Sequence, residues 1–211
     1  MRILCALLLV PVALLGSVDA SQTEFNYTSL SVGGSAVSFH DNLPVRRSIL
    51  PADVVNHTGL RGVTIATSLQ ARPNLVLGLR GHQLSRQKQG TRIEEQTGAL
   101  SLGYVAPLRD GTDYVLSGTV IRSAVDLCSR LLCAVLRETG YEAGITLRHR
   151  VAGPVELEAT VSYRDVGELG SSPALAVGGG YWLTHSGAIT ANIKSTKSFA
   201  DFRIGYRYAF W

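Results

Sequence analysis

The sequence predicts an all-β fold, a transmembrane antiparallel up-and-down β-barrel of about ten strands formed by residues 21–211. Three observations lead to this prediction. Apolar residues alternate with small or polar residues along most of the chain, which is the period of a β-strand. Short and long connections alternate between the predicted strands, as they do in barrels that cross a membrane. The polar faces of the strands combine arginine and glutamate with many glycines.

The first twenty residues are predicted to be a secretory signal peptide, which the mature protein lacks. Arg2 precedes an apolar stretch, residues 3–15, and the segment 18–20 has the small residues of a cleavage site. The apolar stretch is too short for a helix that crosses a hydrocarbon core of about 30 Å. Cys5 leaves with the signal peptide, so Cys128 and Cys133 remain in a chain exported to an oxidising compartment.

The period of two is clearest in residues 74–83, where Leu75, Leu77 and Leu79 alternate with small or polar residues, and in residues 156–164. The first predicted strand, at about 25–33, is less regular, and its facing stays open. Ten is an even number, as expected of a bacterial barrel, and eight is the alternative if two strands are misread. The other predicted strands lie at about 60–70, 96–106, 113–125, 134–150, 174–184, 188–194 and 200–210.

The predicted connections differ in length on the two sides of the sheet. About 25 residues follow the first strand, three residues (71–73) follow the second, and eleven (85–95) follow the third. Short periplasmic turns and longer outer loops are typical of membrane barrels, whereas Greek-key sandwiches seldom sort their connections in this way. We therefore expect the first loop, at about 34–58, and the cysteine-bearing hairpin to carry recognition outside the cell.

The facing of the apolar side chains separates a membrane barrel from a soluble one. In a soluble barrel the apolar face points inward. Glycine weakens a strand, so solvent-facing positions seldom need many of them, whereas a lumen crowded with long charged side chains needs small neighbours. We therefore predict that the polar face points inward. Aromatic residues on the apolar face gather near strand ends, as in the girdles of membrane barrels: Tyr104, Tyr114, Tyr141, Tyr163, Tyr181, Tyr206, Tyr208 and Phe210.

The last strand carries alternating apolar or aromatic residues to the end of the chain. This pattern resembles the C-terminal signal of bacterial outer-membrane β-barrel proteins, which the barrel-assembly machinery recognises. The resemblance implies the outer membrane of a Gram-negative bacterium, and the length is similar to that of small barrels such as the opacity-protein group. Which of the last two aromatics takes the terminal role stays open, because the alternation ends one residue early. The signal comprises Phe202, Ile204, Tyr206, Tyr208, Phe210 and Trp211.

The two cysteines admit two structures. A disulfide between Cys128 and Cys133 fits a hairpin in which Tyr114 faces Leu147, so that the apolar sets of both strands share one face. The competing prediction is a loop helix over residues 123–137, where apolar residues have helical spacing. Five residues of helix separate the two cysteines by about 7.5 Å along the axis, so the helix and the disulfide exclude one another. We favour the disulfide hairpin.

The inward charges are predicted to fill the lumen. A lone buried charge costs several kcal/mol, so these groups must pair and would then close the barrel as a salt-bridged plug. In the last hairpin, Ile193 opposite Phe202 would place Lys194 beside Asp201 as an ion pair. The alternative is a narrow, anion-preferring channel that uses the excess of arginine. The predicted network comprises Arg80, Glu142, Arg148, Arg150, Glu156, Glu158, Arg164, Lys194, Asp201, Arg203 and Arg207.

Catalysis has weak support in this sequence. A lipid-modifying hydrolase built from His82, Ser85 and Glu94 or Glu95 ranks third, because a histidine with an ordinary structural partner is much commoner. No nucleophile elbow, metal-binding helix motif or phosphate loop is present. We therefore expect no enzyme activity, no cofactor and no metal.

The expected partners follow from the location. Basic residues are scattered with few stacking aromatics, so nucleic acid is not an expected ligand. Arg86, Lys88 and Arg92 are predicted to contact lipopolysaccharide phosphates at the outer surface. The protein is expected to be a monomer surrounded by outer-membrane lipid, with an unknown surface ligand.

Overall fold

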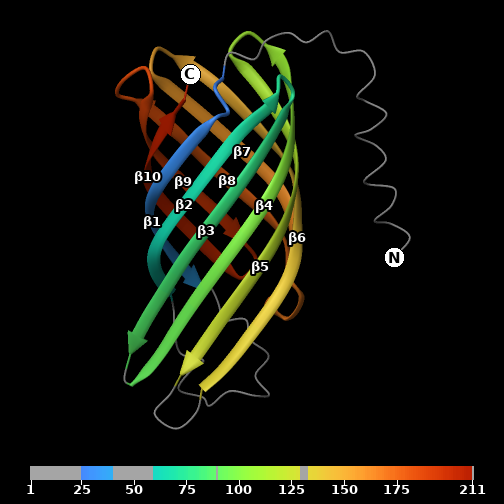
Figure 1. Cartoon of the computed structure of the whole chain (residues 1–211). Coiled ribbons are helices and arrows are strands. Elements are labelled where there is room, and N and C mark those ends of the chain that lie inside the picture. The colour runs from blue at the N-terminus through green and yellow to red at the C-terminus, as the bar shows by residue number, and fades with distance from the viewer. Residues whose placement is uncertain (1–24, 40–58, 89, 129–132, 211) are drawn as a thin grey trace, which may run out of the picture.

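Ten antiparallel strands close into one barrel in a computed structural model that describes residues 25–39, 59–88, 90–128 and 133–210 (Figure 1). Each strand pairs with its neighbours in sequence, and β1 pairs with β10 to close the barrel, which confirms ten strands rather than eight. The strands are β1 (Ser29–Phe39), β2 (Gly59–Arg72), β3 (Leu75–Lys88), β4 (Thr91–Arg109), β5 (Thr112–Cys128), β6 (Cys133–Ala152), β7 (Val155–Asp165), β8 (Ser171–Trp182), β9 (Gly187–Thr196) and β10 (Phe199–Ala209).

The sequence-based prediction misplaces the first strand. β1 begins at Ser29 and not near Phe25, and it continues to Phe39. Phe25 and Tyr27 alternate with polar residues as a strand would, but they lie buried before the strand begins. The signal peptide (1–20), residues 40–58 of the predicted first loop and Trp211 lie outside the described residues.

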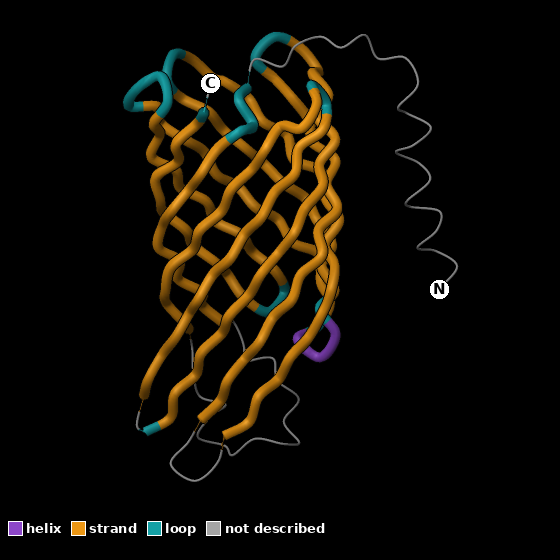
Figure 2. The backbone as a smooth tube through the Cα atoms, in the orientation of Figure 1, coloured by secondary structure: helices purple, strands orange, loops and turns teal. Residues whose placement is uncertain are grey.

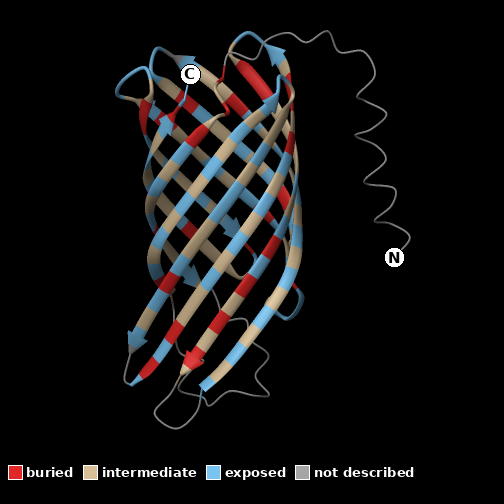
Figure 3. Ribbon diagram, in the orientation of Figure 1, coloured by how far each residue is buried: buried red, intermediate tan, exposed pale blue. Residues whose placement is uncertain are grey.

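The outward face of the barrel is apolar. Leu79, Leu100 and Ile204 are each more than half exposed, at 57%, 55% and 53%. Their neighbours in sequence point into the lumen, because successive side chains of a strand lie on opposite faces. Figure 3 shows the resulting bands of exposed and less exposed residues along every strand. Tyr141 and Tyr163 lie outward toward one end of this apolar belt, and Tyr206 lies outward toward the other. This arrangement confirms the prediction that the apolar face points outward and the polar face inward, which is the reverse of a soluble barrel.

Strands β3 to β6 project beyond the other strands at one end of the barrel (Figures 1 and 2). We call this the hairpin end, and we call the opposite end, where Ser29 pairs with Ala209, the terminal end. The predicted eleven-residue connection at 85–95 is wrong, because Lys88 still pairs with Thr91. Polar outward residues made this segment look like a loop, but Ile93 within it and Leu84 just before it point inward and are buried.

Two predicted hairpins have the expected register. Tyr114 faces Leu147 and Cys128 faces Cys133, whose Cα atoms are 4.1 Å apart and whose sulfurs form a disulfide. Residues 123–128 and 133–137 are strands, so the alternative helix is wrong. Between β9 and β10, Ile193 faces Phe202 as predicted. The described residues contain one helix, the 3₁₀ turn Gly167–Leu169, and none long and apolar enough to cross a membrane.

The closing seam between β1 and β10 depends on two facing glycines, Gly33 and Gly205. A Cβ atom at Gly33 would lie 2.3 Å from the carbonyl oxygen of Ile204, and one at Gly205 would lie 2.6 Å from that of Val32. Both contacts are with backbone, which cannot move aside as a flexible side chain can. These glycines therefore allow the two strands to approach closely enough to close the barrel.

Candidate functional site: the lumen

The inward side chains surround a cavity of about 480 Å³, which Tyr27 borders at the terminal end and His82 and Arg164 border toward the hairpin end. Long charged side chains and small residues alternate around its wall, as the sequence predicted. All eleven residues of the predicted charge network face inward, and their carboxylates and cations form groups at different heights in the lumen.

Glu156 is the centre of the group at the terminal end. It is 3% exposed, and its Oε2 atom lies 2.6 Å from a guanidinium nitrogen of Arg148 and 2.6 Å from one of Arg207. Its other oxygen lies 3.7 Å from Arg150. Arg207 also lies over the ring of Trp182, with 5.1 Å between the guanidinium carbon and the ring centroid. One carboxylate on β7 therefore joins β6 to β10 across the lumen.

Residues 25–28 occupy the mouth of the lumen beside this group. The guanidinium of Arg148 lies 4.6 Å from the ring centroid of Phe25 and 5.1 Å from that of Tyr27. The hydroxyl of Tyr27 donates to Asp113 at 3.1 Å, and burial raises the pKa of Tyr27 above its ordinary value. The backbone N–H of Phe210 donates to the carbonyl of Thr28 at 2.9 Å. We call residues 25–28 the terminal plug.

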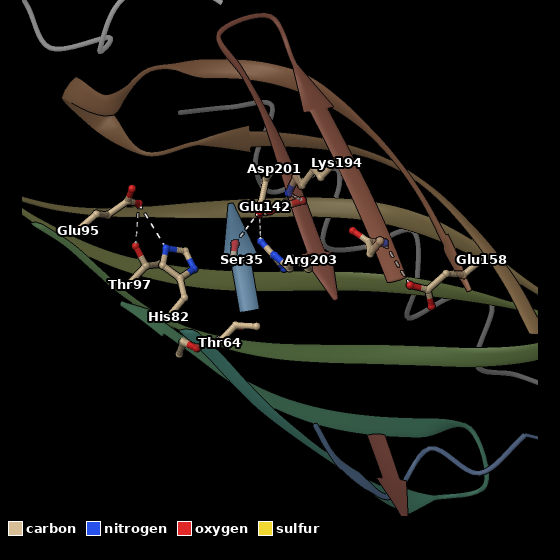
Figure 4. Close-up of polar contacts among 12 residues, drawn as sticks. Ser35, Thr64, His82, Glu95, Thr97, Glu142, Glu158, Lys194, Asp201 and Arg203 are labelled. Atoms are coloured by element: carbon tan, nitrogen blue, oxygen red, sulfur yellow. Dashed lines mark hydrogen bonds and ion pairs between the residues drawn. The ribbon is translucent and has the colours of Figure 1, made fainter. Parts of the chain in front are cut away.

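A second group lies toward the hairpin end (Figure 4). Glu142 accepts hydrogen bonds from Lys194 at 2.5 Å and from Ser162 at 2.6 Å. Asp201 accepts from Ser35 at 2.7 Å and forms an ion pair with Arg203. The predicted register of Lys194 opposite Asp201 is correct, but the predicted ion pair between them is wrong.

The reason lies in the neighbouring strands. Asp201 already has two partners, and Lys194 lies beside the small residue Ala176 on β8. Its long side chain is therefore free to extend across the lumen to Glu142 on β6.

Three charged side chains of the network have no ion pair within 4.0 Å in the described part of the chain: Arg80, Arg164 and Glu158. Glu158 accepts a hydrogen bond from Asn192 at 3.3 Å. Arg164 lies 5.9 Å from the ring centroid of Phe199. Arg80 lines the cavity and is exposed to it. The network is thus only partly paired, and its surplus is positive.

His82 and Glu95 face one another at the hairpin end (Figure 4). The Nε2 atom of His82 lies 3.4 Å from Oε1 of Glu95, to which Thr97 donates at 3.2 Å. Burial acts to raise the pKa of Glu95, but the hydrogen bond and charge of His82 outweigh it, so this pKa is lower than usual. Ser85 lies on the opposite, outward face of β3, so the structure does not assemble the considered Ser-His-Glu arrangement.

An apolar cluster lies inward at the hairpin end, and sequence reasoning missed it. Its members alternate with polar outward residues, which is the reverse of the pattern in the apolar belt. Val37 and Phe39 of β1 and Leu136 of β6 pack against it. The buried members are Leu60, Leu84, Ile93, Val125 and Leu127. In the described residues no group of three or more His, Cys, Asp or Glu side chains could hold a metal ion.

The predicted lipopolysaccharide residues do not share one face. Arg86 points inward and donates to the carbonyl of Gly59 at 3.2 Å, whereas Arg92 points outward and lies 2.6 Å from Glu94. Hydrogen bonds from Gln96 and Gln83 lower the pKa of Glu94. The side chain of Lys88 lies outside the described residues.

The residues of the predicted assembly signal lie together on one face. Along β10 and just beyond it, they point outward and are each 44% to 53% exposed. The described members are Phe202, Ile204, Tyr206, Tyr208 and Phe210.

No family model matches this sequence, and no curated protein matches it. Solved structures do match the fold of this chain. The NanC porin has 7% sequence identity and a TM-score of 0.50, over 86% of this chain and all (100%) of that one. The fold is that of the small outer-membrane β-barrels.

Two other solved structures have lower scores. The attachment invasion locus protein Ail of Yersinia pestis has 11% identity and a TM-score of 0.48, over 88% of this chain and 99% of that one. The neisserial surface protein NspA has 10% identity and a TM-score of 0.46, over 86% and 96%. At these identities the likeness concerns the fold alone.

Proposed function

We propose that this protein is a monomeric outer-membrane barrel with a closed lumen, which acts at the cell surface through the projecting strands β3 to β6 and the loops beside them. The apolar belt supports the membrane location, because its side chains would otherwise be exposed to water. The disulfide at the projecting hairpin supports export to an oxidising compartment. The outward aromatic residues of β10 support recognition by the assembly machinery.

The packing at the two ends of the lumen is the observation that supports this proposal. The terminal plug fills one mouth, with Phe25 2% exposed and Tyr27 9% exposed. The buried members of the apolar cluster at the hairpin end are between 0% and 3% exposed. A water-filled channel would need a continuous polar path, and both ends of the lumen oppose one.

Planar-bilayer recording of the purified barrel tests closure. We expect no single-channel steps from the native protein. Phe25→Ala with Tyr27→Ala removes two rings of the terminal plug, and Tyr104→Ala, on the outward face, is the matched aromatic control. Steps from the native protein at neutral pH would contradict the closed lumen. Protease cleavage of the projecting strands on intact cells tests the surface role, and their complete protection would contradict it.

The position of Arg80 supports a second candidate function, that of a narrow anion-preferring channel. Arg80 lines the cavity and has no ion pair within 4.0 Å among the described residues, so its guanidinium is available to an anion in the lumen. In this case the native protein conducts, and Arg80→Gln shifts the reversal potential in a salt gradient toward cation preference. Unchanged ion preference in that variant would contradict a role of Arg80 in anion selection.

A further inference from the structure

Two arginines lie side by side on the outward face where the apolar belt ends. Arg122 on β5 faces Thr139 on β6, and Arg137 faces Ala124, so the two arginines are diagonal neighbours. Cβ atoms in this relation are about 7–8 Å apart, which long side chains span easily. Both arginines are exposed, and neither has a hydrogen bond or ion pair with any residue that the structure describes.

The surface beside Arg122 is bare and apolar. Arg122 faces Gly98 on β4, and Gly98 faces Gly81 on β3. A Cβ atom added at Gly98 would meet nothing within 4 Å. On the belt side of this row, Val120 is 58% exposed and Leu100 is 55% exposed. The two arginines therefore lie next to an exposed apolar surface.

The acidic residues on this face form no ion pair within 4.0 Å with either arginine among the described residues. Glu94 is held by Arg92 at 2.6 Å and by Gln83 at 2.6 Å. Asp126 faces Val135, one outward position from Arg137, and forms no ion pair within 4.0 Å among the described residues. The partner that fits this surface has a negative head at the level of the arginines and an apolar body that extends toward the belt.

We infer that Arg122 and Arg137 bind a phosphate of lipid A in the outer leaflet, with an acyl chain lying over Gly98 and Leu100. This inference rests on the proposed outer-membrane location. A guanidinium forms paired hydrogen bonds with phosphate, and two converging guanidinium groups supply more donors than one ammonium group does. The site replaces the set Arg86, Lys88 and Arg92, of which Arg86 faces the lumen and Arg92 is already paired with Glu94.

The test is the affinity of the full-length mature barrel, in detergent, for purified lipid A. Arg122→Gln with Arg137→Gln is the test variant, and Arg72→Gln, an exposed arginine at the terminal end of β2, is the matched control. Loss of one charged hydrogen bond weakens binding about tenfold or more, so we expect the double variant to bind at least about tenfold less tightly. The control and Arg122→Lys with Arg137→Lys should bind more tightly than the double glutamine variant.

Two further arms identify the phosphate. Dephosphorylated lipid A should bind the native protein as weakly as the double variant binds lipid A. Phosphatidylglycerol should bind weakly to both, and equal loss with this lipid would show a general phospholipid site and overturn the lipid A assignment. Unchanged lipid A affinity in a double variant that still folds and inserts into membranes would overturn the inference. Failure of the native barrel to insert would instead overturn the proposed location.

Discussion

Replacement of Glu156 by glutamine tests the lumen network most sharply. The carboxylate is almost completely buried and holds Arg148 and Arg207, each with a 2.6 Å contact. Breaking a buried ion pair by removing one partner costs about 3–5 kcal/mol, because the remaining charge is left uncompensated. Glutamine keeps one acceptor oxygen, and the adjoining cavity of about 480 Å³ is large enough to hold water. We therefore expect Glu156→Gln to lower the free energy of unfolding by about 3 kcal/mol.

Glu158→Gln is the matched control, since Glu158 lies two residues away on the same face of β7. Its carboxylate accepts one hydrogen bond, from Asn192 at 3.3 Å, and has no ion pair within 4.0 Å among the described residues. We expect its loss to cost about 1 kcal/mol or less, the value of one ordinary hydrogen bond.

The assay is urea unfolding of the barrel in lipid vesicles, followed by tryptophan fluorescence and heat-modifiable electrophoretic mobility. Trp182 reports on this group directly, because Arg207 lies 5.1 Å from its ring centroid. Equal losses in Glu156→Gln and Glu158→Gln, or a loss below about 1 kcal/mol in the first, would refute the argument that Glu156 organises the terminal end of the lumen.

Three further predictions concern the projecting hairpin, the seam and acid. Cys128→Ser with Cys133→Ser should lower the free energy of unfolding by about 2 kcal/mol, because the disulfide reduces the entropy of the unfolded chain by closing a short loop. Equal stability of the native and reduced proteins would contradict this. Gly205→Ala should lower the free energy of unfolding by about 1–3 kcal/mol, because the added Cβ atom would contact backbone. Gly118→Ala should not, because its Cβ atom would meet no atom within 4 Å. Equal urea midpoints of the two variants would contradict the role of Gly205 at the seam. The pKa of Glu95 is lower in the folded protein than in the unfolded chain, where it is about 4.3, so the ionised carboxylate stabilises the fold above that pH. This stability is lost as the pH falls through the lower pKa of the folded protein. Glu95→Gln should therefore reduce the loss of stability in acid, measured as urea midpoints from pH 7 to pH 3.

The strand number and the facing could be predicted because they depend on local alternation. Leu75, Leu77 and Leu79 establish the period, and the glycine-rich polar face favours an inward direction, since exposed strands gain little from glycine. The disulfide register followed from parity, because a shift by one residue would place Tyr114 and Leu147 on opposite faces.

The terminal plug and the projecting strands could not be predicted in this way. Phe25 and Tyr27 alternate as strand residues do, and only their contacts with Arg148 and Asp113, more than eighty residues away, place them in the mouth of the lumen. The segment 85–95 has polar outward residues because it lies beyond the apolar belt, so composition alone marks it as a loop.

Partners across the lumen were also beyond the sequence. Neighbour register placed Lys194 beside Asp201, but the contact forms between β9 and β6, which are not adjacent strands. Long flexible side chains reach past small neighbours such as Ala176, and nothing in local alternation specifies which carboxylate they meet.

The most direct test of the whole account is the surroundings of adjacent strand residues, measured with spin labels on single cysteines in lipid vesicles. Labels at Leu100 should collide often with oxygen, which dissolves in lipid, and rarely with a water-soluble nickel complex. Labels at Ser101, the next residue on β4, should show much less contact with oxygen. The opposite result, with Leu100 shielded from lipid and Ser101 in contact with it, would contradict a barrel whose apolar face points outward.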